Sequence, residues 1–291
     1  MRHYPASPQA ARRPLRARLR RGYTPRVTAD LSRIRPERAG VPARLPRTAR
    51  IVLPAYDEAD NLPALLRALQ ETMDDNRIAY EVIVVDDGSR DRTAAIVEEW
   101  AAELPLVLVR HSVNQGLGAT LRDGLQTALE RASARDIVIT MDADDTHTPG
   151  LIVQMVRMIG EGYDVVIASR YRAESRVYGV PLLRRVMSRA GSLLLRTVFP
   201  IRGVRDFTCG YRAYRADVLR RAVEHYRGEF VNQDGFQCMV DILLKLRPMR
   251  LIFGEVPLLL RYDRKGGQSK MRVGRTVRNT LLLLVRRRLG Y

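Results

Sequence analysis

The sequence has little of several features that define other classes of protein. It contains two cysteines, Cys209 and Cys238, in 291 residues, which is too few for a disulfide framework or a cysteine-rich metal cluster. A reducing, cytosolic compartment is therefore favoured. No stretch approaches the roughly 18 apolar residues of a membrane-spanning helix. The N-terminal segment also lacks the apolar core of a secretory signal. Its composition alone does not exclude a targeting peptide of another kind.

Acidic residues are scarce overall, and most of all near the N-terminus. The formal net charge is +18, with a pI of about 10.7. Residues 1–48 contain thirteen arginines and no lysine against only Asp30 and Glu37, a net charge of +11. Seven prolines and no apolar periodicity predict that this segment is a disordered basic arm. We expect it to rest on an anionic membrane surface, and nucleic-acid binding is the less favoured use of the same charge.

The rest of the chain alternates short apolar strands with helices of ten to fifteen residues. The expected strands cover residues 49–54, 80–85, 106–109, 137–141 and 164–168. This alternation predicts an α/β fold with a mainly parallel, doubly wound sheet. We expect one domain over residues 49–262, preceded by the basic arm and followed by a segment over residues 263–291.

Polar side chains follow four of these strands. They are Tyr56 and Glu58, then Asp86 and Asp87, then Asn114, then Asp142 and Asp144. The carboxyl ends of parallel strands meet at the crevice where such sheets bind ligands. Carboxylates gathered there repel one another unless a cation or a hydroxyl-rich ligand satisfies them. A nucleotide held through a metal suits this pattern, whereas an ordinary Asp-rich turn is the simpler interpretation of any one loop alone.

Six motifs in order resemble those of the inverting GT-A glycosyltransferases. They begin at Pro54, Val85, Asn114, Asp142, Ala168 and Arg264 and read PAYDE, VDDGS, NQGLGA, DAD, ASR and RKGGQSK. Within that class the sequence is most similar to the dolichol-phosphate or polyprenol-phosphate mannosyltransferase group, over about residues 50–271. The resemblance implies a Rossmann-like GT-A fold, a nucleotide-sugar donor, Mg²⁺ or Mn²⁺, and a lipid-phosphate acceptor.

The resemblance also assigns residues to the donor and the metal. It implies that the donor contacts Pro54, Tyr56, Glu58, Val84, Asp86, Asp142, Ala143 and Asp144. Asp142 and Asp144 would hold the metal, since Mg²⁺ takes carboxylate oxygens and shares its ligands with substrate phosphates. The sequence departs from the family at Thr146, which stands in place of glutamine as the third metal position. A zinc site at the adjacent His147 is disfavoured, because the other three histidines lack ligand spacing.

A second group of residues resembles the family's acceptor-phosphate site. It consists of Arg170, Arg184 and Ser188. On a helix expected to begin near Pro181, Arg184 and Ser188 lie one turn apart on the same face. Arginine suits this role because its planar fork donates paired hydrogen bonds to phosphate oxygens. A solvated arginine face on a core helix is the alternative, chiefly for Arg185 and Arg189.

Residues 203–212 resemble a family segment that lines the donor sugar, with Cys209 where serine is common. Downstream, Asp234 stands where many relatives keep a catalytic base, and we expect the next helix to open around residues 232–236. Asp234 is therefore either a helix N-cap or a catalytic or sugar-contacting carboxylate. A phosphate acceptor needs no base, because its second pKa is near 6, whereas an alcohol acceptor needs one.

The final segment joins a glycine-containing loop to a basic, apolar helix. Arg264 and Lys270 flank Gly266 and Gly267, and the resemblance implies that both cations close over the donor diphosphate and stabilise its departure. Residues 276–288 predict an interfacial, amphipathic helix with basic flanks, and core packing of this helix is the alternative.

We therefore expect a glycosyltransferase that moves mannose from GDP-mannose to a polyprenyl or dolichyl phosphate with inversion. It would be cytoplasmic and peripheral on the inner face of the cell membrane, and a separate membrane subunit is a further candidate partner. The nearer alternative transfers from UDP-glucose or another UDP-sugar to a soluble alcohol, with Asp234 as the base. The remote alternative is a basic nucleic-acid-binding protein, although we do not expect a nucleic acid as a partner.

Overall fold

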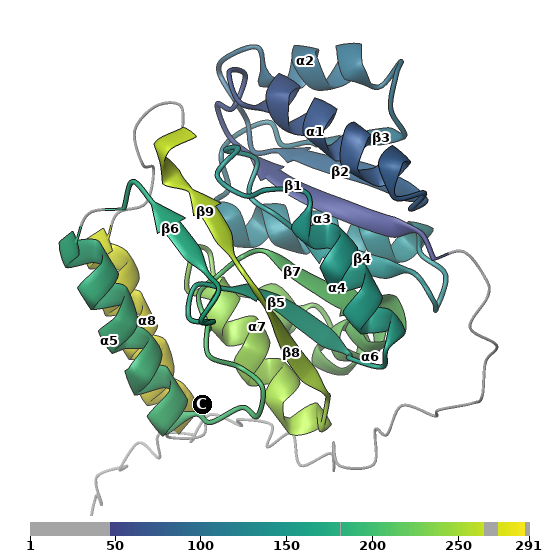
Figure 1. Ribbon diagram of the computed structural model, residues 1–291. Helices are drawn as coiled ribbons and strands as arrows, with labels where there is room; N and C mark the ends of the chain where they lie inside the picture. The colour runs from purple at the N-terminus through teal and green to yellow at the C-terminus, as the bar shows by residue number, and fades with distance from the viewer. Residues whose placement is uncertain (1–46, 181, 265–272, 289–291) are drawn as a thin grey trace, which may run out of the picture. The chain divides into compact units, whose positions relative to one another are not determined.

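The computed structural model describes residues 47–180, 182–264 and 273–288 (Figure 1). Almost all of the predicted basic arm lies outside these residues, so its disorder stays a prediction. The strands are β1 (Ala49–Ala55), β2 (Tyr80–Asp86), β3 (Leu106–Arg110), β4 (Ile137–Thr140), β5 (Val165–Ser169), β6 (Arg176–Tyr178), β7 (Arg212–Arg215), β8 (Phe253–Pro257) and β9 (Leu259–Arg261). The α-helices are α1 (Leu62–Asp75), α2 (Thr93–Trp100), α3 (Leu117–Arg131), α4 (Leu151–Gly160), α5 (Leu182–Val198), α6 (Ala216–Tyr226), α7 (Cys238–Leu246) and α8 (Val273–Arg288). The short 3₁₀ helices are Glu229–Val231, Arg247–Met249 and Tyr262–Arg264.

The main sheet has seven strands in the order β3-β2-β1-β4-β7-β5-β8. Only β7 is antiparallel to its neighbours, β4 and β5, and the remaining pairs are parallel. Strands β6 and β9 form a separate parallel pair. The prediction of a mainly parallel α/β sheet is therefore confirmed.

The central strands form because their apolar runs are buried on both faces, as is typical of parallel sheets. All four residues of β4 and all five of β5 are buried. Helix α1 contributes a matching apolar face, because Leu62, Leu65, Leu66 and Leu69 recur at helical spacing and are all buried.

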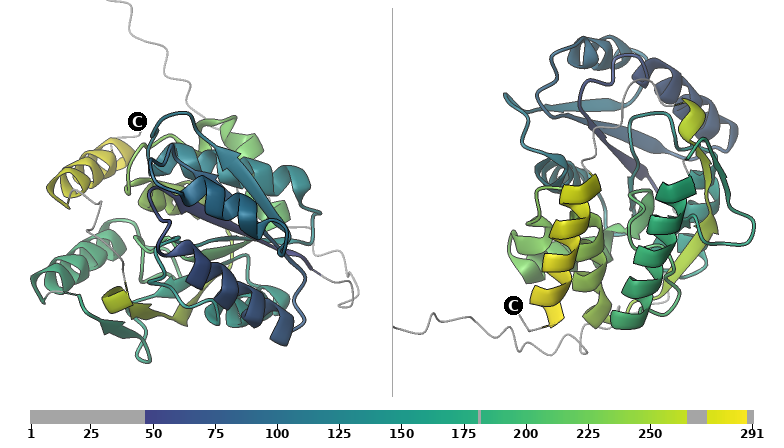
Figure 2. Two further views of the ribbon diagram at one scale, coloured as in Figure 1. Left: turned by 90° about the horizontal axis from the view of Figure 1, so that it is seen from above. Right: turned by 90° about the vertical axis from the view of Figure 1, so that its left-hand side faces the viewer.

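Helices cover both faces of this sheet. In Figure 1, α1 and α4 lie in front of the sheet and α3 and α6 lie behind it, and Figure 2 shows the same arrangement from above. Helices α3 and α6 are tied together by Arg220, whose Nη2 donates to the carbonyl oxygens of Leu129 and Ala132 at 2.7 and 2.9 Å. The carboxyl edge of the sheet is left to the loops that follow β1, β2 and β4.

The structure differs from the expected elements at two places. Strand β7 was not expected, because Arg212-Ala-Tyr-Arg215 carries no apolar run. Helix α7 begins at Cys238 with Gln237 as its N-cap. Asp234 is consequently outside the helix, and the N-cap interpretation of this residue is wrong.

The C-terminal helix α8 has two different faces. Leu283 and Leu284 are buried against the core, and Arg287 forms an ion pair with the buried Asp241 at 2.7 Å. Val277, Leu281, Leu282 and Val285 are exposed. Core packing and an exposed apolar face therefore coexist on this helix. None of the helices in the described ranges is long and apolar enough to cross a membrane.

Candidate active site

The loop after β4 presents the two aspartates on which the metal prediction rests. Asp144 is nine-tenths buried, and its Oδ1 accepts hydrogen bonds from the Thr146 backbone at 3.2 Å and the Thr146 hydroxyl at 2.7 Å. The side chain of Asp142 is 41% exposed. Asp145 takes a left-handed conformation, with φ of 53°, which an aspartate tolerates in a tight turn. The loop thus holds one carboxylate firmly and leaves the other accessible.

His147 contacts Asp142 within the same loop. Its Nδ1 accepts the Asp142 backbone N–H at 3.4 Å, and its Nε2 lies 3.9 Å from Asp142 Oδ2. The ring stacks on buried Tyr211, with centroids 5.1 Å apart. Because Nδ1 accepts, the neutral ring carries its proton on Nε2, the nitrogen that faces the carboxylate. The histidine therefore orients Asp142.

Gly210 brings another part of the chain against Asp142. A Cβ atom at position 210 would lie 3.3 Å from Asp142 Oδ1 and 3.3 Å from Met239 Cε, tighter than ordinary contact. The carbonyl oxygen of Gly210 accepts the Thr140 hydroxyl at 2.6 Å. The glycine therefore lets the backbone approach the carboxylate without displacing it.

Strand β9 connects the Asp142 loop to the predicted lid. The Arg261 N–H donates to the Thr146 carbonyl at 3.0 Å, and His147 forms an antiparallel bridge with Leu260. The chain that leaves β9 thus starts beside the aspartates. The side chain of Arg264 and all of Lys270 lie outside the described residues, so their contacts with the donor stay predictions.

The residues present fit a divalent metal that completes its coordination on a substrate. No group of three His, Cys, Asp or Glu side chains within the described part of the chain could hold a metal by itself. Asp142 and Asp144 supply hard carboxylate oxygens, which is the protein share that Mg²⁺ commonly takes when phosphates provide the rest. The hydroxyl of Thr146, predicted as a metal ligand, donates to Asp144, so in this structure it orients the carboxylate.

The ends of β1 and β2 lie side by side at the expected nucleoside position. Their register pairs Ala55 with Asp86, so Tyr56 begins its loop next to Asp86. Asp86 is wholly buried. Its Oδ1 accepts the Ser89 N–H at 3.0 Å. Its buried Oδ2 forms an ion pair with Arg110, whose Nε is 3.6 Å away, but it accepts no hydrogen bond from the described residues, so it could accept one from a ligand.

Neighbouring Asp87 has a different use. It accepts the backbone N–H groups of Gln115 and Gly116 at 2.8 and 2.9 Å and contacts His111 at 2.8 Å. Asp87 therefore fixes the loop before α3. Other predicted donor residues line the same edge: Pro54 and Val84 are within β1 and β2, and Ala143 is between the aspartates. Val84 and Ala143 are buried, so their contact with a donor stays a prediction.

Glu58, also predicted to bind the donor, is held in the turn after β1. Its Oε2 accepts from the Asn61 amide at 2.6 Å, and its backbone N–H donates to the Thr93 hydroxyl at 2.9 Å. The structure thereby brings Tyr56, Glu58 and Asp86 to one edge of the sheet.

Arg170, predicted to grip the acceptor phosphate, is anchored by a buried carboxylate. Its Nε lies 2.8 Å from Asp206 Oδ2 and its Nη2 lies 2.7 Å from Asp206 Oδ1. Asp206 is wholly buried, and the Arg170 side chain is 24% exposed. Nη2 also donates to the Thr208 hydroxyl. These bonds leave Nη1 as the guanidinium nitrogen without a partner among the described residues.

Ser188 lies close to this arginine. The hydroxyls of Ser188 and Tyr171 are 2.6 Å apart, and the Tyr171 ring lies 5.6 Å from the Arg170 guanidinium carbon. The backbone of Arg184 is one turn earlier on α5, but its side chain lies outside the described part of the structure. Two of the three predicted acceptor residues are thus brought together.

Burial and pairing shift the pKa values around Arg170 in opposite directions. Burial lowers the pKa of the Arg170 guanidinium, but the Asp206 carboxylate outweighs it and the net pKa is raised. Burial raises the pKa of Asp206, and Arg170 more than reverses this, so the net pKa is lowered. Both groups are therefore charged at neutral pH. Burial raises the pKa of the nearby Cys209 thiol to about 12, so this cysteine is not a nucleophile at neutral pH.

Asp234 is exposed and contributes its backbone to the fold. Its carbonyl oxygen accepts the Gly118 N–H at 3.0 Å, and a Cβ atom at Gly118 would lie 1.8 Å from the carbonyl oxygen of Gln233. This tight contact joins the start of α3 to the segment before α7. Within the described ranges no contact supports a catalytic role for the Asp234 carboxylate, which stays a prediction.

Three residues of the site were not assigned a role from the sequence. Asp206 and Gly210 are within the 203–212 segment that was noticed as a whole, but its pattern does not reveal which partner each one contacts. Glu255 is on β8, and its Oε1 accepts the backbone N–H groups of both Arg205 and Asp206. It thereby holds the segment that anchors Arg170.

The acidic loop lies at the carboxyl edge of a mainly parallel sheet, which is where α/β enzymes of this architecture bind their ligands. The chain belongs to glycosyl transferase family 2, whose family model matches residues 50–222. The protein is therefore a glycosyltransferase.

Named relatives share most of this chain. It is 33% identical to an undecaprenyl-phosphate mannosyltransferase of Micrococcus luteus, over 77% of this chain and 87% of that protein. It is 31% identical to a polyprenol monophosphomannose synthase of Mycolicibacterium smegmatis, over 79% of this chain and 84% of that protein. A dolichol-phosphate mannosyltransferase of Pyrococcus furiosus is 29% identical over 78% of this chain, which spans only 60% of that longer relative.

A solved structure shares the fold. Glucosyl-3-phosphoglycerate synthase from Mycobacterium tuberculosis, in complex with Mg²⁺ and uridine diphosphate, superposes with a TM-score of 0.60. It is 20% identical and covers 85% of this chain and 81% of its own. The predicted GT-A architecture is confirmed by this likeness.

Proposed function

We propose that the protein transfers mannose from GDP-mannose to a polyprenyl phosphate, with inversion at the anomeric carbon. The observation that carries the proposal is the junction between the Asp142 loop and β9, formed by the Arg261–Thr146 hydrogen bond and the His147–Leu260 bridge. It places a carboxylate pair beside the start of a cation-bearing segment. An anionic diphosphate between a metal and such cations is the expected arrangement for a nucleotide-sugar donor.

The donor would bind with its nucleoside over the ends of β1 and β2. The Oδ2 atom of Asp86, which accepts no hydrogen bond from the described residues, would accept one from the base or ribose. Asp142 and Asp144 would hold Mg²⁺ or Mn²⁺, which supplies positive charge against the diphosphate oxygens. Thr146 and His147 keep the two carboxylates oriented.

The acceptor phosphate would be held by Arg170, with Ser188 and Arg184 beside it. Because Asp206 fixes the Nε and Nη2 atoms of Arg170, its third nitrogen remains to donate to a phosphate oxygen. A phosphate monoester is largely a dianion at neutral pH and can attack the anomeric carbon without a base. A role for Asp234 as a base is therefore not required by this acceptor.

Mannose and a polyprenyl phosphate are supported by the names of the relatives from Micrococcus luteus and Mycolicibacterium smegmatis. We place the enzyme on the cytoplasmic face of the membrane as a peripheral protein, with or without a separate membrane subunit. The exposed apolar residues of α5 and α8 support membrane contact. On α5 they are Leu182, Val186, Met187, Leu193 and Leu194.

The test supplies full-length enzyme with labelled GDP-mannose or UDP-glucose, Mg²⁺ or Mn²⁺, and either polyprenyl phosphate or lipid-free alcohols. We expect labelled mannose in the lipid fraction, with transfer abolished by EDTA. Label found only on soluble alcohols would favour the second candidate acceptor. The absence of a lipid-linked product with every donor would overturn the proposal.

A further inference from the structure

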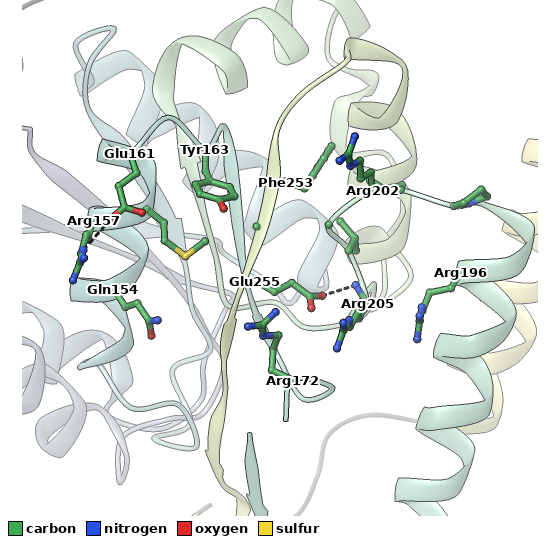
Figure 3. Close-up of a pocket in the computed structure, with 16 residues that line it drawn as sticks. Gln154, Arg157, Glu161, Tyr163, Arg172, Arg196, Arg202, Arg205, Phe253 and Glu255 are labelled. Atoms are coloured by element: carbon green, nitrogen blue, oxygen red, sulfur yellow. Dashed lines mark hydrogen bonds and ion pairs between the residues drawn. The ribbon is translucent and has the colours of Figure 1, made fainter. Parts of the chain in front are cut away.

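A cavity lined by arginines lies outside the proposed active site. Its volume is about 1040 Å³, and it lies between α4, α5 and β8 (Figure 3). Of the residues assigned above, only Gly203, Val204 and Arg205, at the start of the 203–212 segment, line it. The predicted metal and acceptor residues and the other predicted donor residues do not. Five arginines line it, from α4, the loop between β5 and β6, α5, and the loop between α5 and β7: Arg157, Arg172, Arg196, Arg202 and Arg205.

The cavity holds too few carboxylates to neutralise these arginines. Glu161 pairs with Arg157 at 2.9 Å on the same helix. Glu255 is nine-tenths buried, and its Oε1 is used by the backbone N–H groups of Arg205 and Asp206. Among the described residues, no carboxylate forms an ion pair with Arg172, Arg196 or Arg202.

Three of these arginines, Arg172, Arg196 and Arg205, approach one hollow from different elements. In Figure 3, Arg172 extends toward Glu255 and Arg205 from one side, and Arg196 extends from α5 on another. The backbone of residues 205–206 lines the cavity and is fixed in place. Glu255 accepts its N–H groups, and the Asp206 side chain forms an ion pair with Arg170. Guanidinium groups held near one another repel unless an anion lies between them.

We propose that this arginine cavity binds the phosphate group of an organic phosphate at a site separate from the donor and acceptor positions. Arginine forks match phosphate oxygens with paired hydrogen bonds. The cavity volume is that of a small-molecule site rather than of a bare ion. The phosphate is carried either by a lipid headgroup, since α5 also exposes Leu193 and Leu194, or by a soluble metabolite.

The experiment compares two double variants of the full-length protein. R172Q/R196Q removes two charges from the cavity. R77Q/R250Q removes two charges from exposed arginines elsewhere that form no ion pair with the described residues, and it serves as the matched control. Far-UV circular dichroism and the thermal midpoint check that both variants fold.

Two probes distinguish the sources of the phosphate. The soluble probe is glycerol 1-phosphate, titrated at constant ionic strength with EDTA present. The lipid probe is a phosphatidylcholine vesicle with or without phosphatidylglycerol, scored by flotation. We expect wild-type protein and R77Q/R250Q to bind one probe equally, and R172Q/R196Q to bind it at least about tenfold more weakly, as expected for lost charge-assisted hydrogen bonds.

Loss with the soluble probe assigns the site to a soluble phosphate, and loss with the vesicles alone assigns it to a lipid headgroup. Equal weakening of both double variants would show only the general attraction of a basic surface and would overturn the proposal. Failure of the wild-type protein to bind either probe would overturn it as well. Neither result would bear on mannosyl transfer, which is measured separately.

Discussion

Arg170 and Asp206 form a bidentate ion pair, with Nε 2.8 Å from Oδ2 and Nη2 2.7 Å from Oδ1. The Asp206 carboxylate also accepts the backbone N–H groups of Arg170, Thr208 and Cys209 at 3.1 to 3.2 Å. This geometry leaves the arginine little freedom to rotate. We interpret Asp206 as the residue that positions Arg170 for the acceptor phosphate.

Replacement of Asp206 by asparagine is expected to lower both stability and acceptor binding. The variant leaves a guanidinium without its counter-charge, which costs 3–5 kcal/mol for a wholly buried pair. Because Arg170 is 24% exposed, we expect a smaller loss of about 2–3 kcal/mol. Urea unfolding measures the loss, and steady-state kinetics should show a larger rise in KM for the acceptor than for the donor.

The double variant Arg170→Met/Asp206→Leu is the control for this prediction. It removes both charges together, so it should regain part of the stability lost in Asp206→Asn while still binding the acceptor weakly, because Arg170 is absent. Equal changes in donor and acceptor KM in the single variant would indicate that Asp206 supports the fold alone.

The contribution of Asp206 to stability should disappear in acid. Burial raises its pKa and Arg170 lowers it further than burial raises it, so the folded pKa lies below the unfolded value of about 3.9. A depressed carboxyl pKa stabilises the fold above the unfolded pKa, and this stabilisation is lost as the pH falls through the folded value. Urea unfolding of wild type and Asp206→Asn should show a gap that is constant from pH 7 to about pH 5 and narrows below about pH 4. A gap that stays constant down to pH 3 would contradict the assignment.

Gly210→Ala is expected to weaken metal binding more than it weakens the fold. The added methyl group would lie 3.3 Å from both Asp142 Oδ1 and Met239 Cε, and Met239 can move more easily than the loop can. We expect about a tenfold loss in Mn²⁺ affinity measured with bound nucleotide, and a loss of unfolding free energy of about 1 kcal/mol. Gly150→Ala is the matched control, because an added Cβ there meets no atom within 4 Å. Unchanged Mn²⁺ affinity in Gly210→Ala would show that Asp142 does not depend on this contact.

The sheet could be predicted because its central strands are buried on both faces. Strand β5 is wholly buried, so burial imposes a continuous apolar run that is visible in the sequence. Strand β7 has the sequence Arg-Ala-Tyr-Arg and gives no such signal. Its Arg212 is wholly buried because it donates to the carbonyl oxygens of Phe207 and Met239 at 2.8 Å, and these partners are determined only by the tertiary structure.

The site was predictable wherever its residues follow strands in order. Tyr56, Asp86 and Asp142 each come soon after a strand end, and parallel topology brings those ends together. The Arg170–Asp206 pair joins residues 36 positions apart, with α5 in between. Neither residue's type nor its spacing indicates that partner, so the sequence predicted Arg170 without the carboxylate that orients it. The predicted start of helix α7 was too early. The helix has no side-chain cap at its N-terminus, and Gly235 and Phe236 lie before its first residue.

Asp144→Ala and Thr146→Val should reduce transfer by different amounts, since the first removes a carboxylate that we propose as a metal ligand and the second removes only the hydrogen bond that orients it. We expect Asp144→Ala to lower kcat/KM by at least about 10²–10³-fold with the fold intact. Thr146→Val removes the 2.7 Å hydrogen bond to Asp144, which corresponds to roughly tenfold in rate. Rates are measured over a range of Mn²⁺ concentrations, and only Thr146→Val should be rescued by high Mn²⁺. Thr127→Val, which loses a comparable hydroxyl bond within α3, should leave the rate unchanged. A Thr146→Val enzyme as inactive as Asp144→Ala at every Mn²⁺ concentration would instead make Thr146 a metal ligand in its own right.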